Sequence, residues 1–158
     1  MNKTVILQAL ALLRDATPLK TDCGTLCNRA CCAPDGDGQG GVLLLPGERE
    51  LYPFPWGQIE GDVLFCDAPC DRSRRPFNCR IFPLVPAKTK DGTWSVRMDR
   101  RASSLCPLFG YGIKGLDPSF VRAAKEAVRV LAQEKSYLPF LEEWSRRERE
   151  FARQIAPL

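Results

Sequence analysis

Apolar and polar side chains alternate with a helical period at both ends of the chain. Residues 3–14 are apolar around most of the surface that a helix would present, which predicts a well-buried N-terminal helix. Residues 117–133 place apolar side chains three and four positions apart after an Asp-Pro start, the pattern of a capped amphipathic helix. Pro139 opens a further helix, whose other face alternates in charge through residues 142–150 as a solvated face does. The tail is therefore predicted to be a helical hairpin.

The middle third of the chain shows no helical period and is interrupted by many prolines. Short apolar or alternating runs there predict strands, and they lie at residues 42–45, 62–66, 81–85 and 93–98. In the last of these runs Trp94, Val96 and Met98 fall on one face. The dipeptide Asp91-Gly92 supplies a turn before it. This part of the chain is expected to contain only short strands separated by irregular segments.

These elements predict one α+β domain over residues 1–158. It would consist of a small irregular centre with a few short strands, an N-terminal helix and a C-terminal helical hairpin. The cysteine-rich core would span residues 22–106, and the hairpin would span residues 117–155. A chain of 158 residues with 44% hydrophobic and 27% charged residues has the ordinary globular balance and can bury one modest core.

Composition changes this picture through two features, eight cysteines and no histidine. The absence of histidine excludes a Ser-His or Cys-His nucleophile pair, an imidazole general base and a zincin-type zinc site. No catalytic constellation is visible, so we expect a protein that is not an enzyme on its own. The formal net charge of +4 is mild. It requires neither a nucleic acid nor a membrane surface as a partner.

The cysteines could form disulfides in an exported protein or bind metal in a reducing compartment. The apolar run at residues 5–13 is too short to span a bilayer, contains Gln8 and is followed by Arg14-Asp15. It also lacks a small-residue cleavage site, so it does not resemble a signal peptide. We therefore expect a cytoplasmic protein whose clustered cysteines are metal ligands, with the exported disulfide protein as the alternative.

The cysteines fall into two groups along the chain. The first is a Cys-x3-Cys-x3-Cys-Cys run and the second is spread downstream, so that the candidate ligands are Cys23, Cys27, Cys31, Cys32, Cys66, Cys70, Cys79 and Cys106. Ligation by sulfur alone selects zinc, copper(I) or iron–sulfur clusters. Eight thiolates suit two four-cysteine zinc sites or one or two clusters. The Cys-x2-Cys pairs of common zinc ribbons are absent, which favours an iron–sulfur cluster. Structural zinc in a module that binds a protein or nucleic acid is the alternative.

The geometry of the first group depends on the conformation of its backbone. In a helix, the four-residue spacing would place Cys23, Cys27 and Cys31 in one stripe and point Cys32 away. If the chain curls instead, all four thiols could converge on one centre. Adjacent side chains diverge, so Cys31 and Cys32 are expected either to serve different centres or to leave one thiol unligated. In each case the bound metal would organise the irregular centre of the fold.

Residues 70–83 carry a motif, Cys-Asp-Arg-Ser-Arg-Arg-Pro-Phe-Asn-Cys-Arg-Ile-Phe-Pro. Together with the 23–32 run, it resembles a family of cysteine-cluster proteins described as zinc- or iron-chelating. That family has a Cys-x2-Cys-x2-Cys-Cys run and, downstream, Arg-Pro-x2-Cys-Arg-x-aromatic-Pro. The matching positions are Arg75, Pro76, Cys79, Arg80, Phe82 and Pro83, whereas both spacers of the first run are one residue longer here. The resemblance covers residues 22–106 and implies metal chelation without implying a reaction.

Two arginines of this motif, Arg75 and Arg80, are candidate residues for binding the metal cofactor. A centre held by four thiolates is anionic, so a guanidinium could neutralise it or donate hydrogen bonds to sulfur. The alternative is that these arginines are solvated or pair with Asp67 and Asp71, and this alternative is favoured for the neighbouring Arg72 and Arg74. A further basic run at residues 97–101 could contact nucleic acid, but aspartates interrupt it, so a nucleic-acid partner is not expected.

Overall fold

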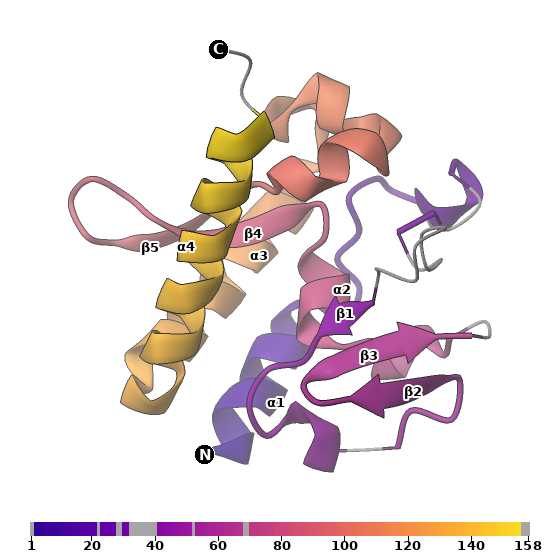
Figure 1. The fold of residues 1–158 in the computed structure, drawn as a ribbon, viewed down its shortest axis with the longest axis vertical. Coiled ribbons are helices and arrows are strands. Elements are labelled where there is room, and N and C mark those ends of the chain that lie inside the picture. The colour runs from indigo at the N-terminus through magenta and orange to yellow at the C-terminus, as the bar shows by residue number, and fades with distance from the viewer. Residues whose placement is uncertain are drawn as a thin grey trace.

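The computed structural model describes residues 2–21, 23–27, 30–31, 41–51, 53–67 and 70–155 (Figure 1). Its helices are α1 (Lys3–Leu12), α2 (Phe77–Ile81), α3 (Pro118–Gln133) and α4 (Leu138–Ile155). Its strands are β1 (Val42–Leu43), β2 (Gly57–Glu60), β3 (Val63–Cys66), β4 (Leu84–Lys88) and β5 (Trp94–Met98). The fold is α+β, as predicted. Within the described ranges, no helix has both the length and the apolar character needed to cross a membrane.

The strands form two separate antiparallel sheets. The first has the order β1-β3-β2, and the second is the β4–β5 hairpin, in which Leu84 pairs with Met98 and Lys88 pairs with Trp94. Helix α3 packs against β5 and α4 packs against β4, while α1 packs on α3. Figure 1 shows α4 crossing the hairpin, with the three-stranded sheet to one side of this helical part of the molecule.

The main hydrophobic core lies between the β4–β5 hairpin and the helices α1, α3 and α4 at the two ends of the chain. Phe120 of α3 and Tyr137, in the short turn before α4, are fully buried in it. Helix α3 starts as its sequence predicts, with the Asp117 carboxylate accepting a hydrogen bond of 2.8 Å from the Ser119 amide. The helices predicted at both ends of the chain are confirmed, but α1 is not well buried as expected. Only one side of it, with Ile6 and Leu10, packs into the core, whereas Leu7 and Leu12 are exposed.

The short helix α2 joins the two parts of the fold. A second, smaller cluster of buried apolar side chains fills the three-stranded sheet and comprises Leu44, Phe54, Trp56 and Leu64. Helix α2 contacts both β1 and β4, and its Asn78 side chain donates to the Leu43 carbonyl. The fully buried carboxylate of Glu48 accepts hydrogen bonds from the amides of Leu45 at 2.8 Å and Phe77 at 2.6 Å. This carboxylate therefore fixes the start of α2.

Two elements of the centre differ from the sequence prediction. Ile81, expected to begin a strand, is the last residue of α2, and β4 begins at Leu84. Strand β2 has no strong sequence pattern, and it pairs closely with β3 because Gly57 has no side chain. A Cβ atom at Gly57 would lie 2.3 Å from the Phe65 carbonyl oxygen.

Candidate functional site

The described residues of the first cysteine run do not form the α-helix that would align its thiols. Cys23 to Thr25 is a single 3₁₀ turn, and the Leu26 amide donates to the Cys23 carbonyl at 3.0 Å. The Ala30 amide closes the next turn on the Cys27 carbonyl at 3.1 Å. The described part of this segment therefore curls. Of the two backbone conformations considered from the sequence, a helix or a curled chain, this is the second. Cys32, a predicted ligand, lies outside the described residues.

Two adjoining cavities collect five of the described cysteines. Cys23, Cys31 and Cys79 line a cavity of about 60 Å³, which we call the arginine cavity. A smaller cavity of about 20 Å³, here the sulfur cavity, is lined by Cys23, Cys27, Cys31 and Cys106. Because Cys23 and Cys31 line both cavities, these thiols form one spatial set. The five-cysteine group comprises Cys23, Cys27, Cys31, Cys79 and Cys106.

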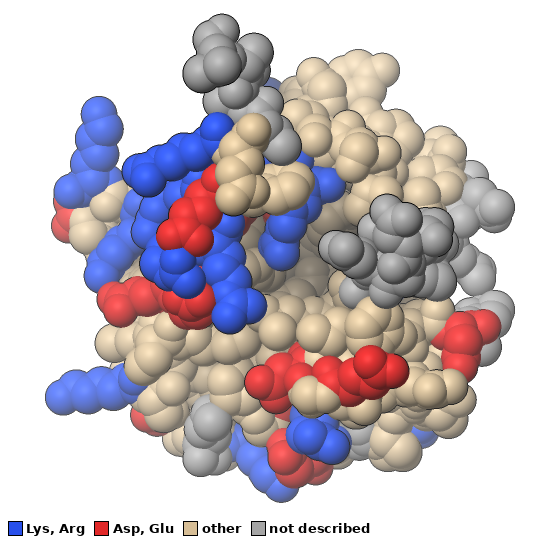
Figure 2. All heavy atoms as spheres, viewed as in Figure 1, with Lys and Arg blue, Asp and Glu red and all other residues tan. Residues whose placement is uncertain are grey.

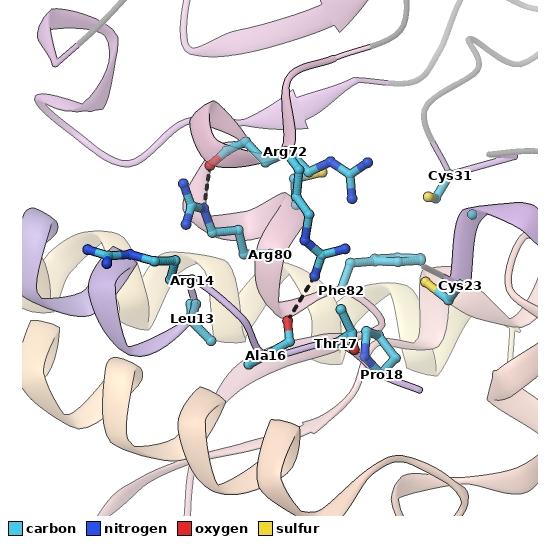
Figure 3. Close-up of a pocket in the computed structure, with 13 residues that line it drawn as sticks. Leu13, Arg14, Ala16, Thr17, Pro18, Cys23, Cys31, Arg72, Arg80 and Phe82 are labelled. Atoms are coloured by element: carbon cyan, nitrogen blue, oxygen red, sulfur yellow. Dashed lines mark hydrogen bonds between the residues drawn. The ribbon is translucent and has the colours of Figure 1, made fainter. Parts of the chain in front are cut away.

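Three segments that are distant in the sequence supply this group. The first run supplies Cys23, Cys27 and Cys31, helix α2 supplies Cys79, and the loop before a 3₁₀ segment at Pro107–Tyr111 supplies Cys106. Figure 3 shows Cys23 and Cys31 on one side of the arginine cavity, with Phe82 next to Cys23. The fold thus brings thiols up to 83 positions apart to a common region, since 106 − 23 = 83.

The surroundings of Cys106 favour its neutral form in the absence of a metal. Burial raises the pKa of the Cys106 thiol, hydrogen bonds from the backbone of Leu108 and Phe109 lower it, and the neighbouring Cys27 raises it further. The same backbone groups would favour a thiolate once a cation replaced the proton. Metal binding at this thiol would therefore release a proton, and its affinity would increase with pH.

The remaining described cysteines are Cys66 and Cys70. Both are half-buried and pack against the smaller apolar cluster, which contains Phe54 and Trp56. Neither of them lines the two cavities of the five-cysteine group. The structure therefore groups five of the eight predicted ligands and places two elsewhere.

The arginines of the motif lie between the two sets of cysteines. Arg75 lines the arginine cavity, and its Nε donates to the Cys70 sulfur at 3.1 Å. Arg80 lines the same cavity and donates to three backbone carbonyls, those of Leu10, Ser73 and Arg75. Arg75 is thus placed to act on sulfur, whereas the guanidinium of Arg80 holds backbone segments together. The role of both in binding a metal cofactor stays a prediction.

Their neighbours Arg72 and Arg74 behave differently from each other. Arg74 is exposed, and its Nε lies 3.7 Å from the Asp71 carboxylate, as the solvated alternative predicted. Arg72 instead lines the arginine cavity and donates to the Ala16 carbonyl at 3.4 Å. No sequence signal distinguishes the two, because their difference comes from the turn at Arg72–Arg74, which directs them to opposite surroundings.

The described cysteines show neither a disulfide nor a ready-made metal-binding group. Among the cysteines that the structure describes, none forms a disulfide. Over the same part of the chain, no three side chains of His, Cys, Asp or Glu stand together as a metal ion would require.

Comparisons with known proteins do not supply a family for this chain. A scan against protein-family models, a search of curated proteins and a search of solved structures found no match. What the chain does must therefore be inferred from its own residues, of which the five-cysteine group and the adjacent arginines have the most distinctive chemistry.

Proposed function

We propose that this protein holds an iron–sulfur cluster through thiolates of the five-cysteine group, in a redox or metal-handling role. The observation that carries the proposal is the grouping of five thiols from three distant segments around two adjoining cavities. Such a cluster, when bound, supplies reversible one-electron chemistry. The chain itself supplies the ligands, the surrounding charge and the apolar walls.

The donor set fits such a group. Cysteine thiolates are the ligands that iron–sulfur clusters use, and soft sulfur ligands select against magnesium, calcium and manganese. Leu26, Phe82 and Leu108 line the sulfur cavity together with the thiols. Apolar walls of this kind limit the access of water, which is one of the factors that set the reduction potential of a cluster.

The backbone that carries three of the ligands can adjust to a metal. The described residues between Cys23 and Cys31 belong to no sheet or α-helix, and single-turn hydrogen bonds such as Leu26 N to Cys23 O connect them locally. Metal binding and local ordering are coupled in sites of this kind.

The positive charge around the thiols also supports a thiolate-ligated centre. A metal held by four thiolates carries net negative charge, and burial makes this charge costly unless cations lie nearby. Arg72 and Arg75 line the cavity that contains Cys79. Arg75 also donates to Cys70, which shows that its guanidinium can reach sulfur.

Structural zinc is the alternative occupant of the same thiols. A nucleic-acid-binding module gains less support, because arginines of the candidate basic surface are paired with acids. Arg101 lies 2.6 Å from Asp99, and Arg97 pairs with the buried Glu148. Figure 2 shows Lys and Arg side chains gathered over one part of the viewed face, interspersed with Asp and Glu.

A reducing location follows from this proposal. Cysteines that hold a metal as thiolates persist where disulfides do not form, so we propose that the protein works in the cytoplasm. A protein partner that exchanges electrons or metal with the centre would be expected there.

Purification without oxygen tests the identity of the bound group. We expect a brown protein that contains iron and acid-labile sulfide and absorbs broadly at about 400 nm. A colourless protein with stoichiometric zinc would favour the alternative occupant. A preparation from cells supplied with iron and zinc that contains neither metal would contradict the proposal.

A further inference from the structure

One buried carboxylate connects the segment that follows β1 to the helix that carries Cys79. The Glu48 side chain is fully buried, and its two oxygens accept hydrogen bonds from two different amides, Leu45 N at 2.8 Å and Phe77 N at 2.6 Å. Leu45 lies three positions before Glu48, whereas Phe77 is the first residue of α2 and lies 29 positions after it. The first amides of a helix have no partner within the helix, so Glu48 supplies one from outside.

A second side chain forms a bond between the same two segments. Asn78, the next residue of α2, donates from its Nδ2 to the carbonyl of Leu43 in β1, and Figure 1 shows α2 beside β1. Residues 43–48 thus bind the first two residues of α2, and Cys79 is the third. Helix α2 has only five residues, and a helix of this length is not stable without contacts to the rest of the protein. The position of Cys79 therefore depends on these two bonds.

The negative charge of Glu48 decides how firmly the two amides are bound. Hydrogen bonds to an ionised acceptor are roughly twice as strong as those between neutral groups. Burial raises the pKa of the Glu48 carboxyl group to about 7, although the charge of Arg80 lowers it, and Tyr137 also interacts with it electrostatically. Above this pH the side chain is ionised, and each of its oxygens can accept one of the two amide bonds.

We propose that Glu48 is a positioning residue for the metal centre, which holds Cys79 in place by fixing the start of α2. Its hydrogen bonds go to backbone amides, so it acts on the centre through α2 and is not itself a ligand. This inference rests on the proposed function, because it assigns Glu48 a role in metal binding at the five-cysteine group. Side chains that orient metal ligands typically change metal affinity on the order of 10- to 100-fold when they are replaced.

Titration of the intact, metal-free chain with Co²⁺ at about pH 8 tests this role, because thiolate ligands give Co²⁺ an intense charge-transfer band. We expect Glu48→Gln to weaken Co²⁺ binding roughly 10-fold, since glutamine offers one oxygen acceptor where the carboxylate offers two. Glu50→Gln is the matched control, because it removes the same charge from the same 3₁₀ turn but from an exposed position. Its effect should be under about twofold.

A double variant separates positioning from a general loss of stability. If Glu48 acts through Cys79, Glu48→Gln should have little further effect on Co²⁺ affinity in a chain that already carries Cys79→Ser. Three results would overturn the role of Glu48. These are losses of affinity that add in the double variant, no loss in Glu48→Gln, and an equal loss in Glu50→Gln.

The reactivity of the thiols in the metal-free chain gives a second measurement, which does not depend on metal binding. Mass spectrometry measures the rate at which iodoacetamide alkylates each cysteine. In Glu48→Gln this rate should rise at Cys79, because the start of α2 opens more often, and stay unchanged at Cys106, which lies outside α2. Equal rates at Cys79 in variant and wild type would overturn the positioning role. Absence of Co²⁺ binding by the wild type, with a raised rate at Cys79 in the variant, would contradict the metal centre alone.

Discussion

Replacing Cys79 by serine is expected to release the metal from the protein and to lower its melting temperature. Cys79 is the thiol that helix α2 contributes to the five-cysteine group. For a four-thiolate site whose binding free energy is ~10–16 kcal/mol, one ligand accounts for roughly 3 kcal/mol, so affinity should fall on the order of 100-fold. Metal analysis of protein equilibrated with a competing chelator measures this loss.

Cys66→Ser is the matched control for this experiment. Cys66 is also a half-buried cysteine, but it packs on the smaller apolar cluster and lines neither cavity. We expect it to retain the metal with an affinity close to that of the wild type. Equal metal content in Cys79→Ser and the wild type would remove Cys79 from the ligand set. Loss of metal in Cys66→Ser alone would indicate that Cys66, and not the five-cysteine group, binds the metal.

The second large effect concerns the pH dependence of stability. Glu48 is fully buried, and burial raises the pKa of its carboxyl group from 4.5 to about 7, although hydrogen bonds from Leu45 and Phe77 and the charge of Arg80 lower it. The folded state therefore binds a proton that the unfolded state has already released between about pH 4.5 and pH 7. The free energy of unfolding should consequently fall as the pH rises through this range, by on the order of 3 kcal/mol.

Glu48→Gln provides the control, because glutamine has almost the same volume and does not titrate. Urea denaturation at several pH values measures the difference in the free energy of unfolding between wild type and variant. This difference should change between pH 4.5 and about pH 7. The chain contains no histidine, so few other side chains titrate between pH 4.5 and pH 7. Metal-linked effects common to both proteins cancel in the difference. Parallel pH profiles for the two proteins would show that Glu48 keeps its ordinary pKa.

The helices at the two ends could be predicted because their signals are local. The Asp117 cap and the spacing of apolar residues in α3 lie within one stretch of sequence, and burial of that face fixes the helix. Helix α2 has no comparable signal. Its first amide is bound by Glu48, 29 positions earlier in the chain. Such a long-range bond has no local pattern, so the region around Ile81 was predicted as a strand.

The candidate site was predictable in its residue types and not in its arrangement. Sulfur chemistry identifies cysteines as ligand candidates without any structure. Which of them lie together depends on how α2 and the loop before Pro107 pack against the first run, and spacing along the chain does not contain that information. The same holds for Arg72 and Arg74, which are two positions apart in one turn and differ only in the surroundings they face.

The central claim is that thiolates of this chain bind a metal, and X-ray absorption at the metal edge of the anaerobically purified protein tests it most directly. We expect a first shell made of sulfur at about 2.3 Å, with further iron neighbours if the group is a cluster. The Cys79→Ser variant should contain less metal under the same conditions. A first shell of oxygen and nitrogen alone would contradict the account, because it would place the metal outside the five-cysteine group.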